Sequence, residues 1–188
     1  MLEAITQISP AAFDEWAILP ENRDKRLELI HGEVFELPSN AFSSEIAAQI
    51  SFLIKWFLKE NKIKGHVTGE AAGFRVGNDR YAPDVAYLSA TRQAELDRVG
   101  YNRTAPELVV EVISSDSPQE LHALRVKISN YLALDCVVWI VNPVIKQVEV
   151  HIPNQAVIVY NENDTIHGEP ALPGLSILVS QIFDVYNL

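Results

Sequence analysis

Apolar residues recur along the chain in two different spacings. Between residues 45 and 58 they return every three or four positions, the spacing of one helical face, and Ser43 and Ser44 precede this run as candidate N-caps. In two short segments they are consecutive instead: 108–113, which is interrupted only at Glu111, and 137–141, which is apolar throughout. Such runs are typical of strands buried on both faces. The pattern predicts a long amphipathic helix and two central strands.

A second helix is predicted between the two central strands. Ser117 is suited to its N-cap and Pro118 to its first helical position, and the segment extends to about Leu134. Consecutive strand, helix and strand segments form a βαβ unit, in which the two strands lie side by side and parallel. The centre of the expected sheet is therefore parallel.

Shorter segments predict the rest of the fold. Residues 26–30 and 33–37 surround His31-Gly32, a two-residue turn of the kind that joins a β-hairpin. Further expected elements are strands at 66–76, from about Asp84, at 147–152 and at 156–160, a short surface helix at 91–99, and a short terminal segment ending at Phe183. We expect a single α/β (α+β) domain over 1–188, with a mixed central β-sheet flanked by helices and an N-terminal extension at 1–25.

Composition narrows the functional classes. The chain has 188 residues, of which 48% are hydrophobic, which excludes disorder as its main state. Fifteen Lys and Arg against 25 Asp and Glu give a formal charge of −10, which argues against polyanion binding driven by the overall field. The single Cys136 excludes an internal disulfide and a thiolate zinc cluster. With no apolar run long enough to span a membrane and no signal-peptide pattern, we expect a cytoplasmic protein.

Charged residues inside apolar elements are the main candidates for chemistry, since the glycine-rich phosphate loops, the GxSxG serine motif and the HExxH zinc motif are all absent. Glu111 lies within the apolar strand 108–113, where burying an ionised carboxylate without a partner would cost several kcal/mol. Lys127 borders the inward stripe of the following helix, so the two side chains are expected to meet. The residues alone leave two roles open: a buried structural pair or part of a reactive site.

Asp84 favours the reactive site. It begins a strand after Pro83, so that two carboxylates, Asp84 and Glu111, face one region beside a lysine. Two such carboxylates repel each other unless a cation lies between them, and few hard oxygen ligands suit Mg²⁺ or Mn²⁺. Glu70 is a candidate third ligand, although a solvent-facing strand position explains it equally well.

The order of these segments resembles the PD-(D/E)XK nuclease superfamily, and more closely its Uma family of putative restriction endonucleases. The resemblance extends over nearly the whole chain. It rests on the hairpin 27–33, Gly73-Phe74-Arg75, Pro83-Asp84-Val85, the strand around Glu111 with Ser114, the spacing from Lys127 to Tyr131, and Val138-Trp139-Ile140-Val141 with Pro143.

The resemblance implies a restriction-endonuclease-like fold, DNA as substrate, Mg²⁺ or Mn²⁺ as cofactor and a homodimer. It implies that Asp84 and Glu111 hold the metal, with the carbonyl of Val112 or Ile113 as a further ligand. The superfamily's lysine lies two residues after the acid, where this chain has Ile113, so the resemblance places the lysine on the following helix as Lys127.

A supporting acid is also implied, either Glu45 at the start of the long helix or Glu70, which is slightly preferred. The chain departs from the family pattern with Ser115 where Pro is usual and with no Gly at 134–135. The competing hypothesis is a non-catalytic module of the same fold, in which Glu111 and Lys127 form a structural pair and the acidic surface binds a protein partner.

Overall fold

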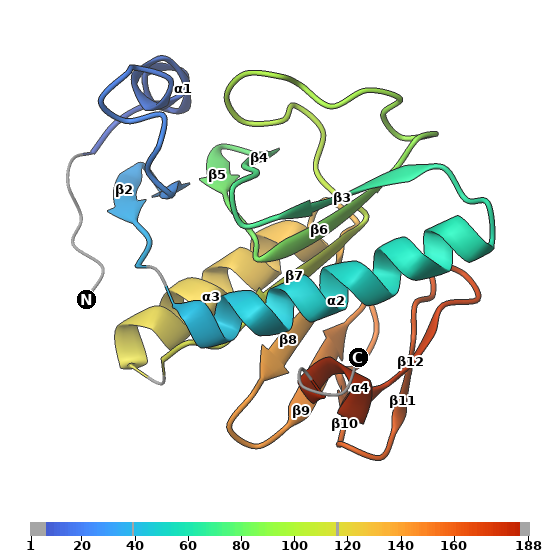
Figure 1. Cartoon of the computed structure of the whole chain (residues 1–188). Helices are drawn as coiled ribbons and strands as arrows, with labels where there is room; N and C mark the ends of the chain where they lie inside the picture. Colours follow the sequence, from blue (N-terminus) through green and yellow to red (C-terminus); the bar gives the residue numbers. More distant parts are fainter. Residues whose placement is uncertain (1–6, 39, 116, 185–188) are drawn as a thin grey trace.

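The computed structural model describes residues 7–38, 40–115 and 117–184 (Figure 1). The helices of this described part are α1 Pro10–Ala17, α2 Ala41–Glu60, α3 Pro118–Leu132 and α4 Val179–Phe183. Its strands are β1 Leu27–Ile30, β2 Glu33–Glu36, β3 Gly65–Gly69, β4 Phe74–Val76, β5 Asp79–Tyr81, β6 Val85–Ser89, β7 Leu108–Val112, β8 Val137–Asn142, β9 Gln147–His151, β10 Ile158–Tyr160, β11 Thr165–His167 and β12 Ser176–Leu178. No helix among these residues is long and apolar enough to cross a membrane.

The main sheet has six strands in the order β10-β9-β8-β7-β6-β3. Its central pair, β7 and β8, is parallel, and every other neighbouring pair in it is antiparallel. This arrangement confirms the mixed sheet and the βαβ unit, with α3 as the crossover. The other strands do not join this sheet, as the single expected sheet would require. They form two smaller sheets, a four-stranded one in the order β2-β1-β5-β4 and the pair β11-β12.

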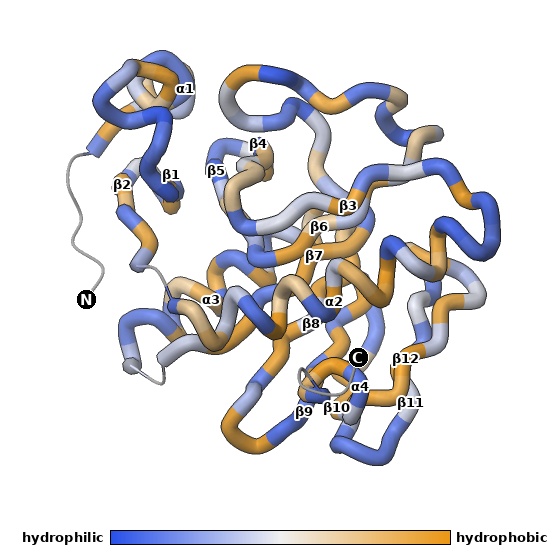
Figure 2. Tube along the Cα trace, viewed as in Figure 1, coloured by the Kyte–Doolittle hydropathy of each residue, from blue (hydrophilic) through white to orange (hydrophobic). Residues whose placement is uncertain are grey.

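Helices cover both faces of the main sheet. On one face α2 buries Ile46, Ile50 and Ile54 against Val110 and Trp139. On the other face Tyr131 of α3 packs in a cluster with Val109, Val138 and Ile140. Figure 1 shows α2 in front of the sheet and α3 behind it, and Figure 2 shows the hydrophobic residues that run along β7 and β8 between them. Because side chains alternate along β7, Glu111 lies on the α3 face.

The start of the long helix differs from the prediction. Asn40 is the N-cap of α2, and its side-chain oxygen accepts hydrogen bonds from the backbone N–H groups of Phe42 and Ser43 at 3.1 and 3.2 Å. Ser43 is buried within the first turn, and the Ser44 hydroxyl donates to Glu70 at 3.4 Å. The prediction that Ser43 or Ser44 caps the helix was wrong, because Asn40 is an equally good cap three residues earlier.

The surface helix predicted at 91–99 is absent, since this segment consists of turns and bends. Asn102 organises it: its side-chain oxygen accepts from Gln93 Nε2 and from the N–H of Asp97, both at 3.0 Å, while its amide donates to Gln93 Oε1 and to the Thr104 carbonyl, both at 2.9 Å. These bonds replace the ladder of a helix. The prediction failed because they depend on a residue outside the segment.

Other boundaries also differ. The extended stretch expected at 66–76 is broken by a turn, so that β3 joins the main sheet while β4 joins the four-stranded one. Of the strand expected at 156–160, only Ile158–Tyr160 is paired. The expected hairpin is present, and both turn residues have positive φ, 50° at His31 and 85° at Gly32, as two-residue hairpin turns require. Within the expected N-terminal extension, α1 buries Phe13 against Leu29 and Val34 of the hairpin.

Cys136 provides a simple test of core packing. The side chain is fully buried just before β8, and burial raises the pKa of its thiol to about 12. Because the thiolate is the reactive form, we expect iodoacetamide at pH 8 to leave the native protein unmodified and to add one group after denaturation, as read by intact mass. Rapid alkylation of the native protein would contradict the buried position.

Candidate active site

The site is built around Glu111 on the central strand β7 and Lys127 on α3. The Lys127 ammonium lies 2.8 Å from Glu111 Oε1, which confirms that the two side chains meet. Lys127 is one of two buried residues of its helix, with a side chain only 8% exposed. The βαβ connection produces this contact, because it folds α3 back over the strand that precedes it.

Glu28 of the hairpin is a third member that the sequence analysis did not propose as a site residue. Its Oε1 lies 2.8 Å from Lys127 Nζ and accepts a second hydrogen bond from the Ala82 N–H at 2.8 Å. A signal was present in the sequence, since Glu28 interrupts an apolar strand just as Glu111 does. The buried lysine is therefore held between two carboxylates from two different sheets.

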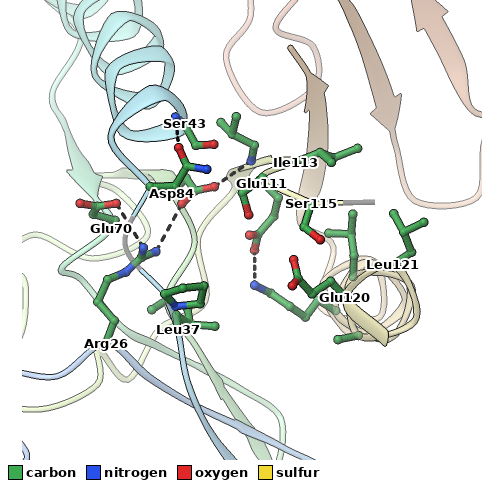
Figure 3. Close-up of a pocket in the computed structure, with 18 residues that line it drawn as sticks. Arg26, Leu37, Ser43, Glu70, Asp84, Glu111, Ile113, Ser115, Glu120 and Leu121 are labelled. Atoms are coloured by element: carbon green, nitrogen blue, oxygen red, sulfur yellow. Dashed lines mark hydrogen bonds and ion pairs between the residues drawn. The ribbon is translucent and has the colours of Figure 1, made fainter. Parts of the chain in front are cut away.

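Asp84 lies beside this cluster at the start of β6, the antiparallel neighbour of β7. Its Oδ2 accepts a hydrogen bond from the Val112 N–H at 2.8 Å, and its Oδ1 lies 3.3 Å from Arg26 Nη2. Arg26 also contacts Glu70 at 3.2 Å, so its guanidinium joins the two carboxylates (Figure 3). Arg26 is a further residue that the sequence analysis did not propose.

These groups open into a pocket of about 130 Å³, a volume that admits several water molecules. Asp84, Glu111, Lys127 and Glu70 all line it, together with Val112. Glu120 of α3 lines it as well, and Figure 3 shows this side chain at α3, away from Asp84. Of the two candidate supporting acids, Glu70 therefore lies in the pocket.

Glu45 is placed differently. It is exposed on the first turn of α2 and does not line the pocket. The preceding residue, Ser44, is the one that reaches Glu70, since its hydroxyl donates to Glu70 Oε1 at 3.4 Å. The structure thus brings together Asp84, Glu111, Lys127 and Glu70, and leaves Glu45 apart from them.

The proton affinities follow from burial and from the surplus of carboxylates. Burial raises the pKa of Glu111, the Lys127 ammonium opposes this shift, and the nearby charges of Asp84 and Glu28 add to it. Burial also raises the pKa of Asp84, partly offset by the Val112 N–H and by Lys127 and Arg26. Burial alone would lower the pKa of Lys127, but Glu111 and Glu28 outweigh it and raise it, so the ammonium remains charged.

The donor set fits a divalent cation by its charge. Five carboxylates lie at the pocket or directly behind it, those of Glu28, Glu70, Asp84, Glu111 and Glu120, against two cationic side chains, Arg26 and Lys127. Such an excess of acidic groups attracts a cation, and carboxylate oxygens are the ligands that Mg²⁺ and Mn²⁺ prefer. Among the described residues no three His, Cys, Asp or Glu side chains form a metal-binding group by themselves, so further ligands would be backbone oxygen or water.

The fold of this chain is shared with a protein of known structure. The chain is similar to a solved structure, a putative nuclease belonging to DUF820 from Anabaena variabilis ATCC 29413, with a TM-score of 0.78 and 20% identity over 95% of this chain and 98% of that one. This likeness shows a shared nuclease-like fold and confirms the expected fold class. A search of curated proteins found no match.

The family model of Uma2, described as putative restriction endonuclease, matches residues 10–180. That range contains Asp84, Glu111 and Lys127, and it covers most of the chain. The resemblance seen in the order of the sequence segments is thereby confirmed, and the chain belongs to the Uma2 family of putative restriction endonucleases.

Proposed function

We propose that this protein is an Mg²⁺- or Mn²⁺-dependent endonuclease that hydrolyses phosphodiester bonds of DNA. The observation that carries the proposal is the meeting of Asp84, Glu111 and Lys127 at one pocket, with Lys127 Nζ 2.8 Å from Glu111. A buried lysine next to paired carboxylates in an open pocket is an arrangement suited to activating water.

In this proposal Asp84 and Glu111 hold the cation, with the carbonyl of Val112 as a further ligand. A bound divalent ion supplies a Lewis acid for the phosphate and lowers the pKa of a coordinated water. Hydrolysis joins the water oxygen to phosphorus, breaks one bond from phosphorus to a sugar oxygen, and delivers a proton to that leaving oxygen. The residues must therefore position the water and stabilise the growing negative charge.

Lys127 supplies a positive charge that stabilises the negative charge growing on the phosphate. Its ammonium can donate three hydrogen bonds, and Glu28 and Glu111 accept two of them. The third is left to orient the attacking water or to contact a phosphate oxygen. Glu28 is a positioning residue, because its own carboxylate is held by the Ala82 N–H and fixes Lys127 without lining the pocket.

The competing hypothesis, a non-catalytic module with a structural Glu–Lys pair, requires a sealed pair. Glu111 and Lys127 instead line the same pocket as Asp84, which favours the catalytic role. A homodimer is part of the proposal, because two copies are suited to cutting two strands. The edge strand β10 exposes apolar side chains that suit such a contact, at Ile158 and Val159 beside Val157.

The test is cleavage of supercoiled plasmid in low salt with Mg²⁺ or Mn²⁺. We expect the wild-type protein to cut, EDTA to abolish cutting, and Asp84→Ala to lose it under the same purification. Plasmid cleavage that persists in EDTA or in Asp84→Ala would contradict the proposed site. A wild type that neither cuts nor binds Mn²⁺ would favour the non-catalytic module.

A further inference from the structure

A second and larger groove adjoins the pocket. It has a volume of about 680 Å³ and is formed by the loop between α1 and β1 on one side and by residues 98–101 on the other. Arg26, Glu70 and Ala82 line both the groove and the pocket. The groove is therefore continuous with the site that contains Asp84.

The two walls of the groove are fixed to each other. The Tyr101 hydroxyl donates to the Leu27 carbonyl at the start of β1, and the Tyr101 ring packs 5.3 Å from the ring of Phe13. The same ring lies so close to Gly73 that a Cβ at this position would collide with it. The groove is thus a built part of the fold and exists before anything binds.

The charge of the groove is opposite to that of the whole chain. Four cationic side chains line it, Arg23, Lys25, Arg26 and Arg98, against only two carboxylates, Asp24 and Glu70. The chain as a whole has a formal charge of −10 and only 15 Lys and Arg. A local surplus of positive charge on such a protein attracts an anion to this face.

The four cationic side chains of the groove differ in whether a carboxylate already pairs with them. Arg26 is held by Asp84 and Glu70, and Arg23 lies 3.8 Å from Asp24 in a pair that is exposed to solvent. Within the described part of the chain, the Lys25 ammonium donates to the neutral side chain of Asn22, at 3.2 Å, and forms no ion pair. Arg98 is exposed and has no ion-pair partner among the described residues. Lys25 and Arg98 thus present their charge to a ligand.

We propose that this groove binds the phosphodiester backbone of the DNA strand that enters the pocket, with Arg23, Lys25 and Arg98 contacting phosphates next to the one beside Asp84. The inference rests on the proposed function for the identity of the strand. A regularly charged backbone fits a groove that has cations on both walls and adjoins the acidic pocket, because phosphate contacts fix the position of a strand while the neighbouring pocket holds the reacting phosphate.

The test compares two charge-matched triple variants. The groove variant carries Arg23→Gln, Lys25→Gln and Arg98→Gln, and the control variant carries Lys55→Gln, Lys59→Gln and Lys64→Gln at exposed positions in and after α2. Both lower the formal charge from −10 to −13. Binding of a short fluorescein-labelled DNA duplex is measured by anisotropy in EDTA over a range of salt concentrations, so that cleavage is not needed.

We expect the groove variant to bind at least about tenfold more weakly and to lose about two to three from the slope of log affinity against log salt, since each phosphate contact contributes roughly 0.9. The control variant should bind like the wild type. Equal weakening in both variants, or no DNA binding by the wild type, would overturn the inference. Binding that depends on the groove without any plasmid cleavage would support the groove and contradict the endonuclease.

Discussion

Lys127→Met is expected to lower the free energy of unfolding by about 3–5 kcal/mol, because it leaves two carboxylates without their shared cation. Glu28 and Glu111 each lie 2.8 Å from the ammonium, and their side chains are only 2% and 11% exposed. With so little of either side chain exposed, water from the pocket compensates the lost charge only in part. Methionine keeps most of the side-chain volume, so the loss reports charge and not a cavity.

Urea denaturation of the wild type, Lys127→Met and the double variant Glu28→Gln with Lys127→Met measures this effect. The double variant should recover part of the loss, since it removes one of the two stranded carboxylates. Lys55→Met, at an exposed position of α2, serves as the matched control and should change stability by less than about 0.5 kcal/mol. A similar small change for Lys127→Met would show that the ammonium does not neutralise the cluster.

Glu111→Gln should separate stability from activity. Burial raises the pKa of Glu111, so the folded protein favours the neutral form and the ionised carboxylate lowers stability above its ordinary pKa. Glutamine is neutral at every pH and removes that cost, while Glu28 still neutralises Lys127. We therefore expect unchanged or higher stability at neutral pH and plasmid cleavage reduced by at least about 100-fold, because even outer partners of metal ligands contribute up to that factor.

The two functional hypotheses differ in this experiment. If Glu111 serves only as the structural partner of Lys127, the substitution should lower stability in the same way as Lys127→Met. Glu60→Gln, on the exposed end of α2, removes the same charge away from the pocket and should leave both properties unchanged. The measurements are urea denaturation at pH 7 and initial cleavage rates with Mn²⁺.

Local sequence patterns predicted one half of the site. Glu111 and Lys127 interrupt apolar stripes, and a βαβ connection brings a strand and its crossover helix together whatever the rest of the chain does. The contact that joins them could therefore be expected from the order of the segments alone. Asp84 was identified from its place at a strand start beside Pro83 and from the need to explain two carboxylates in one region.

The other half depends on contacts between distant segments. Glu28 and Lys127 are 99 positions apart, and Arg26 and Asp84 are 58 apart. Their meeting requires β1 to pair with β5 in a second sheet, and no periodicity along the chain specifies that pairing. The loop at 91–99 shows the same limit, because the side chain of Asn102 decides its conformation against a local preference for helix.

Both sheets contribute residues to the site. The six-stranded sheet supplies Asp84 and Glu111, while Arg26 and Glu28 come from the start of the hairpin strand in the smaller sheet. Local opening is most favourable where few apolar contacts hold an element, and the hairpin has a small core of its own. Partial unfolding that releases the hairpin would remove Arg26 and Glu28 from the site at the same time, while the six-stranded sheet remains folded. The proposed enzyme would then lose activity at a lower denaturant concentration than the one that unfolds the whole domain.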